Sequence, residues 1–356
     1  MPDTLVSEDI VLSVLRAVQD PDLGRDIVTL GFVKDLQISG GSVAFKIELT
    51  TPACPVKDDL KAQAETLVGS IPGVESVTVE MTAQVRGEVR TGPLIPTVKN
   101  VIAVASGKGG VGKSTVSCNL AVALAQTGAK VGLLDADIYG PSIPMMMGAT
   151  DGPAAEGSSI TPVVCHGVEI MSIGFFLETD KAVVWRGPMI GKALNQFLGD
   201  VTWGDLDYLI VDLPPGTGDA PMSLAQLIPL TGVVVVMTPQ DVAQQIANKS
   251  IYMFQMLEQS TSRKIPILGV VENMSGFVCP TCGTETPLFS QGGGEKAAER
   301  LGVPFLGAIP LDPSICISGD VGKPAILIAP ESRQAEAIRQ IAGNVAAGVS
   351  ILNMKG

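Results

Sequence analysis

The residues from Gly107 to Ser114 have the spacing of a phosphate-binding loop. They read Gly-Lys-Gly-Gly-Val-Gly-Lys-Ser and satisfy the pattern G-x-x-x-x-G-K-[ST], in which glycines let the backbone wrap phosphates without Cβ clashes. An apolar stretch (101–105) precedes the loop and good helix formers (119–126) follow it, so a chance glycine-rich turn is a poor alternative. We expect Lys113 to reach the β- and γ-phosphates and the Ser114 hydroxyl to ligate Mg²⁺. The predicted nucleotide contacts in this segment are Gly107, Lys108, Gly109, Gly110, Val111, Gly112, Lys113, Ser114 and Thr115.

Carboxylates follow two other apolar stretches. Asp212 ends the run Leu-Ile-Val-Asp, and Asp135 and Asp137 follow a pair of leucines. We expect Asp212 to hold Mg²⁺, usually through water, and the other two aspartates to orient the metal or the attacking water. Gly216, in the turn after Asp212, could sense the γ-phosphate through its amide. Any one of these aspartates could be a turn or helix cap, but three carboxylates ending strands at one edge of a sheet favour a site.

Two cysteines, Cys279 and Cys282, form a C-x-x-C pair followed by Gly283. Two thiolates at this spacing can face one metal ion, whereas a tetrahedral site needs four ligands and the chain has no second such pair. A two-fold axis between two copies of the chain would supply the missing ligands. Four thiolates suit a [4Fe–4S] cluster and Zn²⁺ alike. A redox-active C-x-x-C is the alternative, for which the surrounding phosphate-binding motifs leave little support.

The remaining cysteines carry weaker signals. Cys54 follows a strand pattern and precedes a predicted helix, whose N-terminus would lower the pKa of the thiol. It is therefore a candidate reactive thiol or transient metal ligand, with a quiet structural cysteine as an equal alternative. Cys118 is expected in the core. Cys165 and Cys316 are interpreted as structural, and the single histidine, His166, is given no role.

The elements that must position these residues alternate from residue 100 onward. Strand-length apolar runs occur at 101–105, 130–134, 168–173, 207–212, 232–237, 266–271 and 305–309. Helical segments lie between or after them, notably at 113–127, 240–259 and 332–347. Such alternation predicts an α/β fold with a mostly parallel sheet covered on both faces. Residues 100–356 are accordingly predicted to be a P-loop ATPase domain.

The N-terminal part, residues 1–82, predicts a separate small α+β domain. Helical spacing over 11–18 is followed by alternation over 43–49, a helix over 56–67 and alternation again over 77–81. Residues 83–99 break these patterns with glycines and prolines and are interpreted as a linker. An additional edge strand over 84–89 is an equal alternative for part of that segment.

Length and composition limit the functions that fit. The chain has 356 residues, enough for two domains, and 46% of them are hydrophobic. Its formal net charge is −12, opposite to the basic field of a nucleic-acid binder. We expect no membrane partner, because no run of about 18 apolar residues is present. With no signal-like leader, the protein is expected to be cytoplasmic with reduced cysteines.

Taken together, the motifs resemble a known family. The additional Lys108 in the phosphate loop is similar to the deviant P-loop of MinD/ParA-like ATPases. The segments Asp-Ala-Asp-Ile-Tyr-Gly-Pro-Ser (135–142), Asp-Leu-Pro-Pro-Gly-Thr-Gly-Asp (212–219) and Cys-Pro-Thr-Cys (279–282) resemble the Mrp/ApbC branch, the iron–sulfur cluster carriers. Residues 8–82 resemble the small iron–sulfur assembly domain often fused ahead of this ATPase, on Asp-Pro-Asp-Leu-Gly (20–24) and Thr-Pro-Ala-Cys-Pro (51–55).

The resemblance implies roles that spacing alone does not. It implies a homodimer with ATP near the interface, where Lys108 contacts the partner's phosphates and Asp137 is the switch carboxylate near the attacking water. These two residues and Lys113 are then the expected catalytic residues, and Asn273 the adenine contact. The resemblance also favours a [4Fe–4S] cluster over zinc at Cys279 and Cys282, and a functional over a quiet Cys54.

The resulting hypothesis is an ATP-hydrolysing carrier that binds a cluster at a homodimer interface and transfers it to apo-proteins. Its expected partners are apo iron–sulfur client proteins and cluster-assembly factors. One rival is a MinD/ParA-like positioning ATPase, which would need a basic tail or surface, whereas residues 345–356 carry one charged side chain, Lys355. The other rival is a zinc-binding scaffold that binds nucleotide without turnover.

Overall fold

The computed structural model describes residues 6–87, 94–157, 159–176, 187–261, 263–279, 281–282, 284–289 and 292–355. The chain divides into two compact units, one of Met1–Arg86 together with Ala346–Gly356 and one of Gly87–Val345. The predicted linker (83–99) lies partly outside the described residues, and the predicted domain boundaries stay a prediction. Residues 84–87 form no strand.

Among its described residues before residue 87, the N-terminal unit contains a three-stranded sheet, a two-stranded sheet and two helices. Its elements are α1 (Glu8–Leu15), β1 (Gln19–Asp20), β2 (Arg25–Asp26), β3 (Val33–Ser39), β4 (Ser42–Leu49), α2 (Lys57–Gly69) and β5 (Ser76–Ala83). Strand β4 pairs with β3 antiparallel and with β5 parallel. Every second residue of β4 is buried, as the alternating pattern predicts, and these residues join Leu15 of α1 and Leu60 of α2 in one core. Met354, near the end of the chain, packs against the same core.

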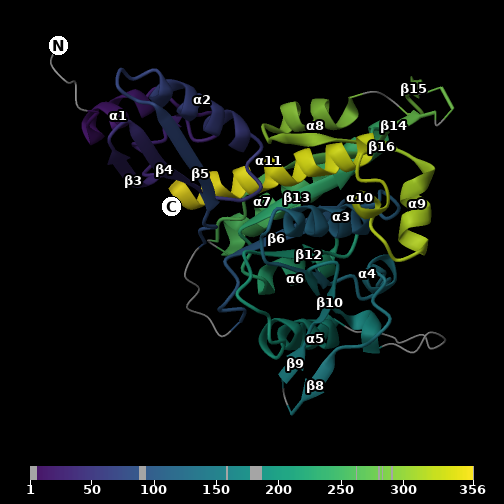
Figure 1. Cartoon of the computed structure of the whole chain (residues 1–356). Coiled ribbons are helices and arrows are strands. Elements are labelled where there is room, and N and C mark those ends of the chain that lie inside the picture. Colours follow the sequence, from purple (N-terminus) through teal and green to yellow (C-terminus); the bar gives the residue numbers. More distant parts are fainter. Residues whose placement is uncertain are drawn as a thin grey trace. The chain divides into compact units, whose positions relative to one another are not determined.

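The larger unit is built on a mostly parallel sheet (Figure 1). Its strands are β6 (Asn100–Ser106), β7 (Val131–Asp135), β10 (Val163–Cys165), β11 (Val168–Ser172), β12 (Tyr208–Asp212), β13 (Gly232–Met237), β14 (Ile267–Val278), β15 (Glu285–Thr286) and β16 (Phe305–Leu311). Among the described residues the order is β10-β11-β7-β12-β6-β13-β14-β15, with β16 also on β14. Only β10 and β15 pair antiparallel with their neighbours there. A separate hairpin joins β8 (Ala154–Glu156) and β9 (Ser159–Thr161).

Helices cover both faces of this sheet. They are α3 (Lys113–Gln126), α4 (Ile143–Met146), the 3₁₀ helix η1 (Ile173–Phe176), α5 (Gly187–Gly199), α6 (Asp219–Leu227), α7 (Asp241–Thr261), α8 (Gly293–Leu301), α9 (Pro313–Asp320), α10 (Ala325–Ile328) and α11 (Arg333–Lys355). Val101 and Ala103 of β6 share one core with Phe197 of α5 and Phe254 of α7. Ile102, equally buried, faces the other way, and α3 contacts β6, β7 and β12. The predicted α/β architecture is confirmed.

Strand β14 departs most from its predicted length. The apolar run ends at residue 271, where Glu272 and Asn273 begin a polar stretch, yet the strand continues to Val278. Both polar side chains are buried and hydrogen-bonded, which is why polar residues could extend a strand here. In the described part of the chain, no helix is long and apolar enough to span a membrane.

Candidate nucleotide and thiolate sites

The phosphate loop needs its glycines for two different reasons. A Cβ at Gly107 would lie 2.6 Å from the Ile246 carbonyl oxygen, so this position has no room for a side chain. Gly112 has φ +81°, a left-handed conformation, and caps the N-terminus of α3. Around Gly109 and Gly110 a Cβ would meet nothing within 4 Å. The loop is therefore packed at its ends and open in the middle, where a helix N-terminus can receive phosphate.

A buried ion pair lies beneath the loop. The Lys113 Nζ atom is 2.5 Å from Asp212 Oδ2, and both residues are buried. The Ser114 hydroxyl donates to the same oxygen at 2.7 Å, and the Ser117 hydroxyl donates to Oδ1 at 2.5 Å. This carboxylate is fully buried and satisfied by one cation and two hydroxyls, as a buried charge must be.

Ser117 was missed by the sequence analysis. It lies three residues after Ser114 and four after Lys113, so it shares their face of α3, and that spacing was available as a signal. The Ser114 hydroxyl beside the Asp212 carboxylate is an oxygen donor set that suits Mg²⁺, which is usually bound by one or two carboxylates together with substrate phosphates. These residues therefore fit the predicted metal.

The two other carboxylates lie at the same edge of the sheet. Asp135 stands beside Asp212 in the register of β7 and β12. It accepts hydrogen bonds from the Ser172 hydroxyl at 2.9 Å and the Ile143 amide at 3.2 Å. Burial and then the charge of Asp212 raise the pKa of Asp135 to about 7. Asp137 is half-buried, and burial raises its pKa as well. The charge of Lys113 acts in the opposite direction and lowers this pKa. The structure thus brings the three predicted carboxylates together.

An apolar pocket of about 420 Å³ adjoins the phosphate loop. Gly112, Thr115 and Asn273 line it next to the loop, and Met145, Met274 and Phe277 are among its apolar residues. Asn273 is buried and donates from Nδ2 to the Val111 carbonyl oxygen at 2.9 Å. A mostly apolar cavity with a few polar groups, next to a phosphate loop, is suited to a nucleotide base.

Two residues predicted to contact nucleotide, Lys108 and Gly216, make hydrogen bonds within the chain. Lys108 donates from Nζ to Gln240 Oε1 at 3.2 Å, a contact to a residue that the sequence analysis did not single out. The Gly216 amide donates to the Ser106 carbonyl oxygen at 2.8 Å, with φ +104° at Gly216. The roles of Lys108 in a partner's site and of Gly216 at the γ-phosphate stay predictions.

The cysteine pair follows strand β14. The Cys279 amide donates to the Thr284 carbonyl oxygen at 3.0 Å, and Cys282 Sγ is 3.2 Å from Thr284 Oγ1. Cys282 is exposed, and its hydrogen bonding with Thr284 and Cys279 lowers its pKa. Pro280 and Gly283 lie outside the described residues. Within the described residues, no group of three or more His, Cys, Asp or Glu side chains could hold a metal ion.

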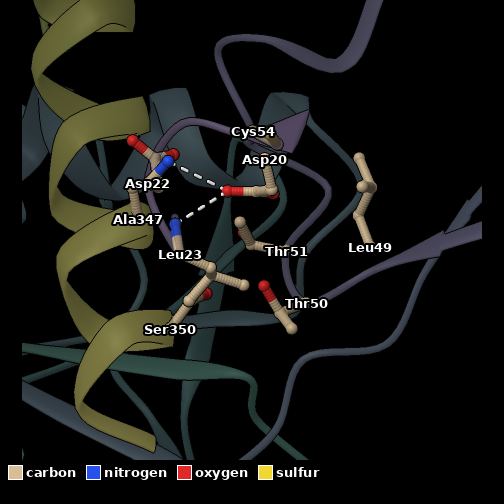
Figure 2. A pocket seen from close by; sticks show the side chains of 9 residues that line it. All are labelled: Asp20, Asp22, Leu23, Leu49, Thr50, Thr51, Cys54, Ala347 and Ser350. Atoms are coloured by element: carbon tan, nitrogen blue, oxygen red, sulfur yellow. Dashed lines mark hydrogen bonds between the residues drawn. The ribbon is translucent and has the colours of Figure 1, made fainter. Parts of the chain in front are cut away.

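Cys54 lies in a small pocket of the N-terminal unit (Figure 2). Asp20 and Asp22 line the pocket with it, as do Ala347 and Ser350 of α11. Asp20 is buried, and its Oδ1 accepts the amides of Asp22 and Leu23 at 2.9 Å each. Burial, with further contributions from the charges of Asp20 and Asp22, raises the pKa of Cys54 to about 11. The Val56 amide at the start of α2 does lower this pKa, but burial outweighs it, so the low pKa expected for Cys54 is not found.

The other cysteines and the histidine occupy ordinary positions. Cys118 is buried in α3, which confirms the expected core location. Cys165 is half-buried at the end of β10, and the side chain of Cys316 is outside the described part of the chain. The Nε2 atom of His166 is 3.3 Å from the Gly322 carbonyl oxygen. None of these contacts indicates a ligand site.

Comparison with known proteins decides the family. The model of the NUBPL iron-transfer P-loop NTPases matches residues 97–346, more than half of the chain. The chain belongs to this family. A second model, of an iron–sulfur cluster assembly protein family, matches residues 8–81. The resemblance drawn from the motifs is thereby confirmed, and the chain is a P-loop NTPase.

Full-length relatives and a solved structure agree. An iron–sulfur cluster carrier protein from Synechocystis sp. is 46% identical over 355 residues, which are 98% of this chain and 99% of the relative. A carrier protein of the same description from Deinococcus radiodurans is 46% identical and covers 96% of each chain. A nucleotide-binding protein from Archaeoglobus fulgidus, solved in complex with ADP, is 38% identical with a TM-score of 0.57. The match covers 66% of this chain and 93% of that one.

Proposed function

We propose that this member of the iron-transfer P-loop NTPases is an ATP-hydrolysing carrier of iron–sulfur clusters, with Cys279 and Cys282 as the cargo ligands. The main observation behind the proposal is that one strand, β14, connects the phosphate loop to the cysteine pair. Strand β14 holds Asn273 against the phosphate loop and leads directly into the cysteine pair, in which Cys279 is half-buried and Cys282 is exposed. A site for nucleotide and a site for soft metal thus belong to one compact unit.

The hydrolysis step rests on positioning and charge. Water attacks the γ-phosphorus, the bond to the β–γ bridging oxygen breaks, and inorganic phosphate and ADP leave. The loop amides and Lys113 hold the phosphates, and Ser114 with Asp212 would hold Mg²⁺, which neutralises phosphate charge when bound. We propose that Asp137 orients the water and that Lys108 contacts a partner's phosphates. Because the described residues at this edge include no evident strong base, turnover is expected to be slow.

The cargo site is proposed as half of a four-thiolate site. Cys279 and Cys282 supply two sulfurs, and the described residues contain no group of three or more His, Cys, Asp or Glu side chains that could hold a metal ion. A second copy of the chain, related by a two-fold axis, would complete a tetrahedral set. We therefore propose a homodimer that carries a [4Fe–4S] cluster to apo-protein clients, in exchange with cluster-assembly factors. A cytoplasmic location fits this role, because the free cysteines need a reducing compartment.

The rivals fit the site less well. A positioning ATPase has no need of a thiol pair in which Cys282 is exposed and has a lowered pKa. A zinc scaffold would use the same thiolates, but it would not need the three carboxylates (Asp135, Asp137 and Asp212) beside the phosphate loop. Bound iron and sulfide are therefore the discriminating quantities.

The test combines metal analysis with turnover. The protein is reconstituted anaerobically, and iron, sulfide and zinc are measured together with Mg²⁺-dependent ATP hydrolysis. We expect iron and sulfide in equal amounts, slow hydrolysis, and none in Lys113→Ala, which loses the phosphate contact. Zinc alone, or hydrolysis by Lys113→Ala at the rate of the parent protein, would refute the proposal.

A further inference from the structure

The pairing of strand β14 with β16 is interrupted between Asn273, beside the phosphate loop, and the end of the strand that precedes Cys279. Asn273 is paired with Ile309 of β16, but the next pair is Phe277 with Leu311. Three residues, 274–276, therefore face the single residue 310, which is an irregular bulge with more than one extra residue. Met274 within it has φ +59°, a conformation uncommon for a residue with a side chain. The same Met274 lines the apolar pocket beside the phosphate loop.

A buried carboxylate holds this bulge. Glu272 is 1% exposed. Its Oε1 accepts the Ser275 hydroxyl at 2.6 Å, which ties the bulge back to the strand. Its Oε2 accepts the Gly294 amide at 2.5 Å, in the first turn of α8. A carboxylate at a helix N-terminus is stabilised by the helix dipole and by charge-assisted hydrogen bonds.

The approach of α8 to Glu272 is close. A Cβ at Gly294 would lie 2.8 Å from the Glu272 Cβ and 3.1 Å from its Oε2, so only glycine allows the amide to reach the carboxylate. The two oxygens of Glu272 thus bind both sides of the segment 279–292. One side is the end of β14 that leads to Cys279, and the other is the helix that follows the cysteines.

We propose that Glu272 is a positioning residue for the cysteine pair and couples it to the nucleotide pocket. The residue next to it, Asn273, contacts the phosphate loop. A nucleotide that shifts Asn273 or Met274 therefore acts on the bulge that Glu272 ties to α8, and so on the segment that presents both sulfurs. The inference rests on the proposed function, in which Cys279 and Cys282 bind metal.

A purely structural reading makes a different prediction. If Glu272 only caps α8, its removal lowers stability and weakens metal and nucleotide binding independently. If it couples the two sites, its removal changes how much nucleotide alters metal affinity, because coupling is the ratio of affinities in the two nucleotide states. That ratio is the quantity to measure.

Co²⁺ serves as the probe, since its thiolate charge-transfer absorption reports binding to sulfur. The full-length reduced protein is titrated with Co²⁺ with and without MgADP, and the ratio of the two dissociation constants is taken. Glu272→Gln keeps one acceptor but loses the charge and one of the two bonds. Glu295→Gln, on an exposed position of the same helix, is the matched control, and Ser275→Ala removes only the bond to Oε1.

We expect Glu272→Gln to weaken Co²⁺ binding about tenfold, the lower end of effects from residues that support metal ligands, and to bring the MgADP ratio close to one. Ser275→Ala should shift the ratio in the same direction by less, and Glu295→Gln should match the parent protein. If Glu272→Gln fails to fold, the ratio of Co²⁺ dissociation constants measured for Ser275→Ala tests the inference by itself.

An unchanged ratio in the folded variants overturns the inference, as does a ratio of one in the parent protein. Failure of the proposed function looks different: the parent protein would then show no thiolate absorption with Co²⁺, or Cys282→Ser would keep it.

Discussion

The thiols of the two units lie in opposite environments. Cys54 is half-buried beside Asp20 and Asp22, and its pKa is raised to about 11. Cys282 is exposed, and hydrogen bonds lower its pKa. The thiolate is the form that binds metal and attacks electrophiles. The difference in pKa therefore favours Cys282 over Cys54 for metal binding and for nucleophilic reactions. The lowered pKa of Cys282 favours its thiolate, whereas Cys54, with a pKa of about 11, keeps its proton at neutral pH.

The largest expected effect separates the two sites by their metal. In anaerobically reconstituted protein, Cys282→Ser should lose its bound iron, because each copy of the chain then gives one sulfur to a site that needs four. Cys54→Ser should retain the iron of the parent protein. Iron and sulfide analysis of the two variants side by side measures this. Equal loss in both would mean that Cys54 is a ligand of the same cluster and would remove the contrast.

The next effect concerns reactivity at neutral pH. A pKa of about 11 in place of 9.0 lowers the thiolate fraction of Cys54 about 100-fold, and greater nucleophilicity restores about tenfold of this. With metal removed by chelation, iodoacetamide should therefore modify Cys282 at least about tenfold faster than Cys54 at pH 7.5. Peptide mass spectrometry gives both rates in one sample. Comparable rates would show that the pocket does not protect the thiol.

These two environments also mark how far sequence reasoning reaches. The phosphate loop and the three aspartates were predictable because strand, loop and helix patterns are local and place their ends at one edge of a sheet. The pKa of Cys54 was not, because it depends on Asp20, more than thirty residues away in sequence, and on burial that no spacing reveals. Glu272 was missed for a similar reason: its partner Gly294 lies beyond the cysteine loop.

The end of the chain gives a second example. The sequence predicted a helix over 332–347, and α11 (Arg333–Lys355) is that helix. Nothing in the pattern indicated what its last residues pack against. Ala346–Gly356 group with the N-terminal unit, and Ala347 and Ser350 line the Cys54 pocket. Apolar periodicity states that a face is buried but does not name its neighbour.

A smaller effect tests which part of the Cys54 environment acts on the thiol. Burial is the larger cause of its raised pKa, and the charge of Asp20 is the larger of the two aspartate contributions. Asp20→Asn removes the charge and leaves an oxygen that can accept the Asp22 and Leu23 amides. Alkylation of Cys54 should then accelerate by less than about tenfold, the effect of one pH unit in thiolate fraction. Asp9→Asn, an exposed residue of α1, is the control and should leave the rate unchanged, whereas equal acceleration in both would implicate net charge alone.

The smallest effect is on stability in alkaline solution, and its sign follows from the direction of the shift. The folded protein holds the Cys54 proton with a pKa of about 11, above the ordinary value of 9.0, so the native state binds this proton more tightly than the unfolded chain does. Its contribution to the free energy of unfolding is full below pH 9 and is lost as pH rises towards 11. Cys54→Ser has no such proton to lose.

Urea unfolding of the parent protein and of Cys54→Ser, followed by proteolytic cleavage within residues 6–86, should therefore give curves that are parallel up to pH 9. Above it they should diverge, with the parent protein losing more stability per pH step. Other groups titrate in this range in both proteins, and their contribution cancels in the difference. Parallel curves up to pH 11 would mean that Cys54 titrates alike in the folded and unfolded chain. The two kinds of thiol would then differ only in exposure and not in their hold on a proton.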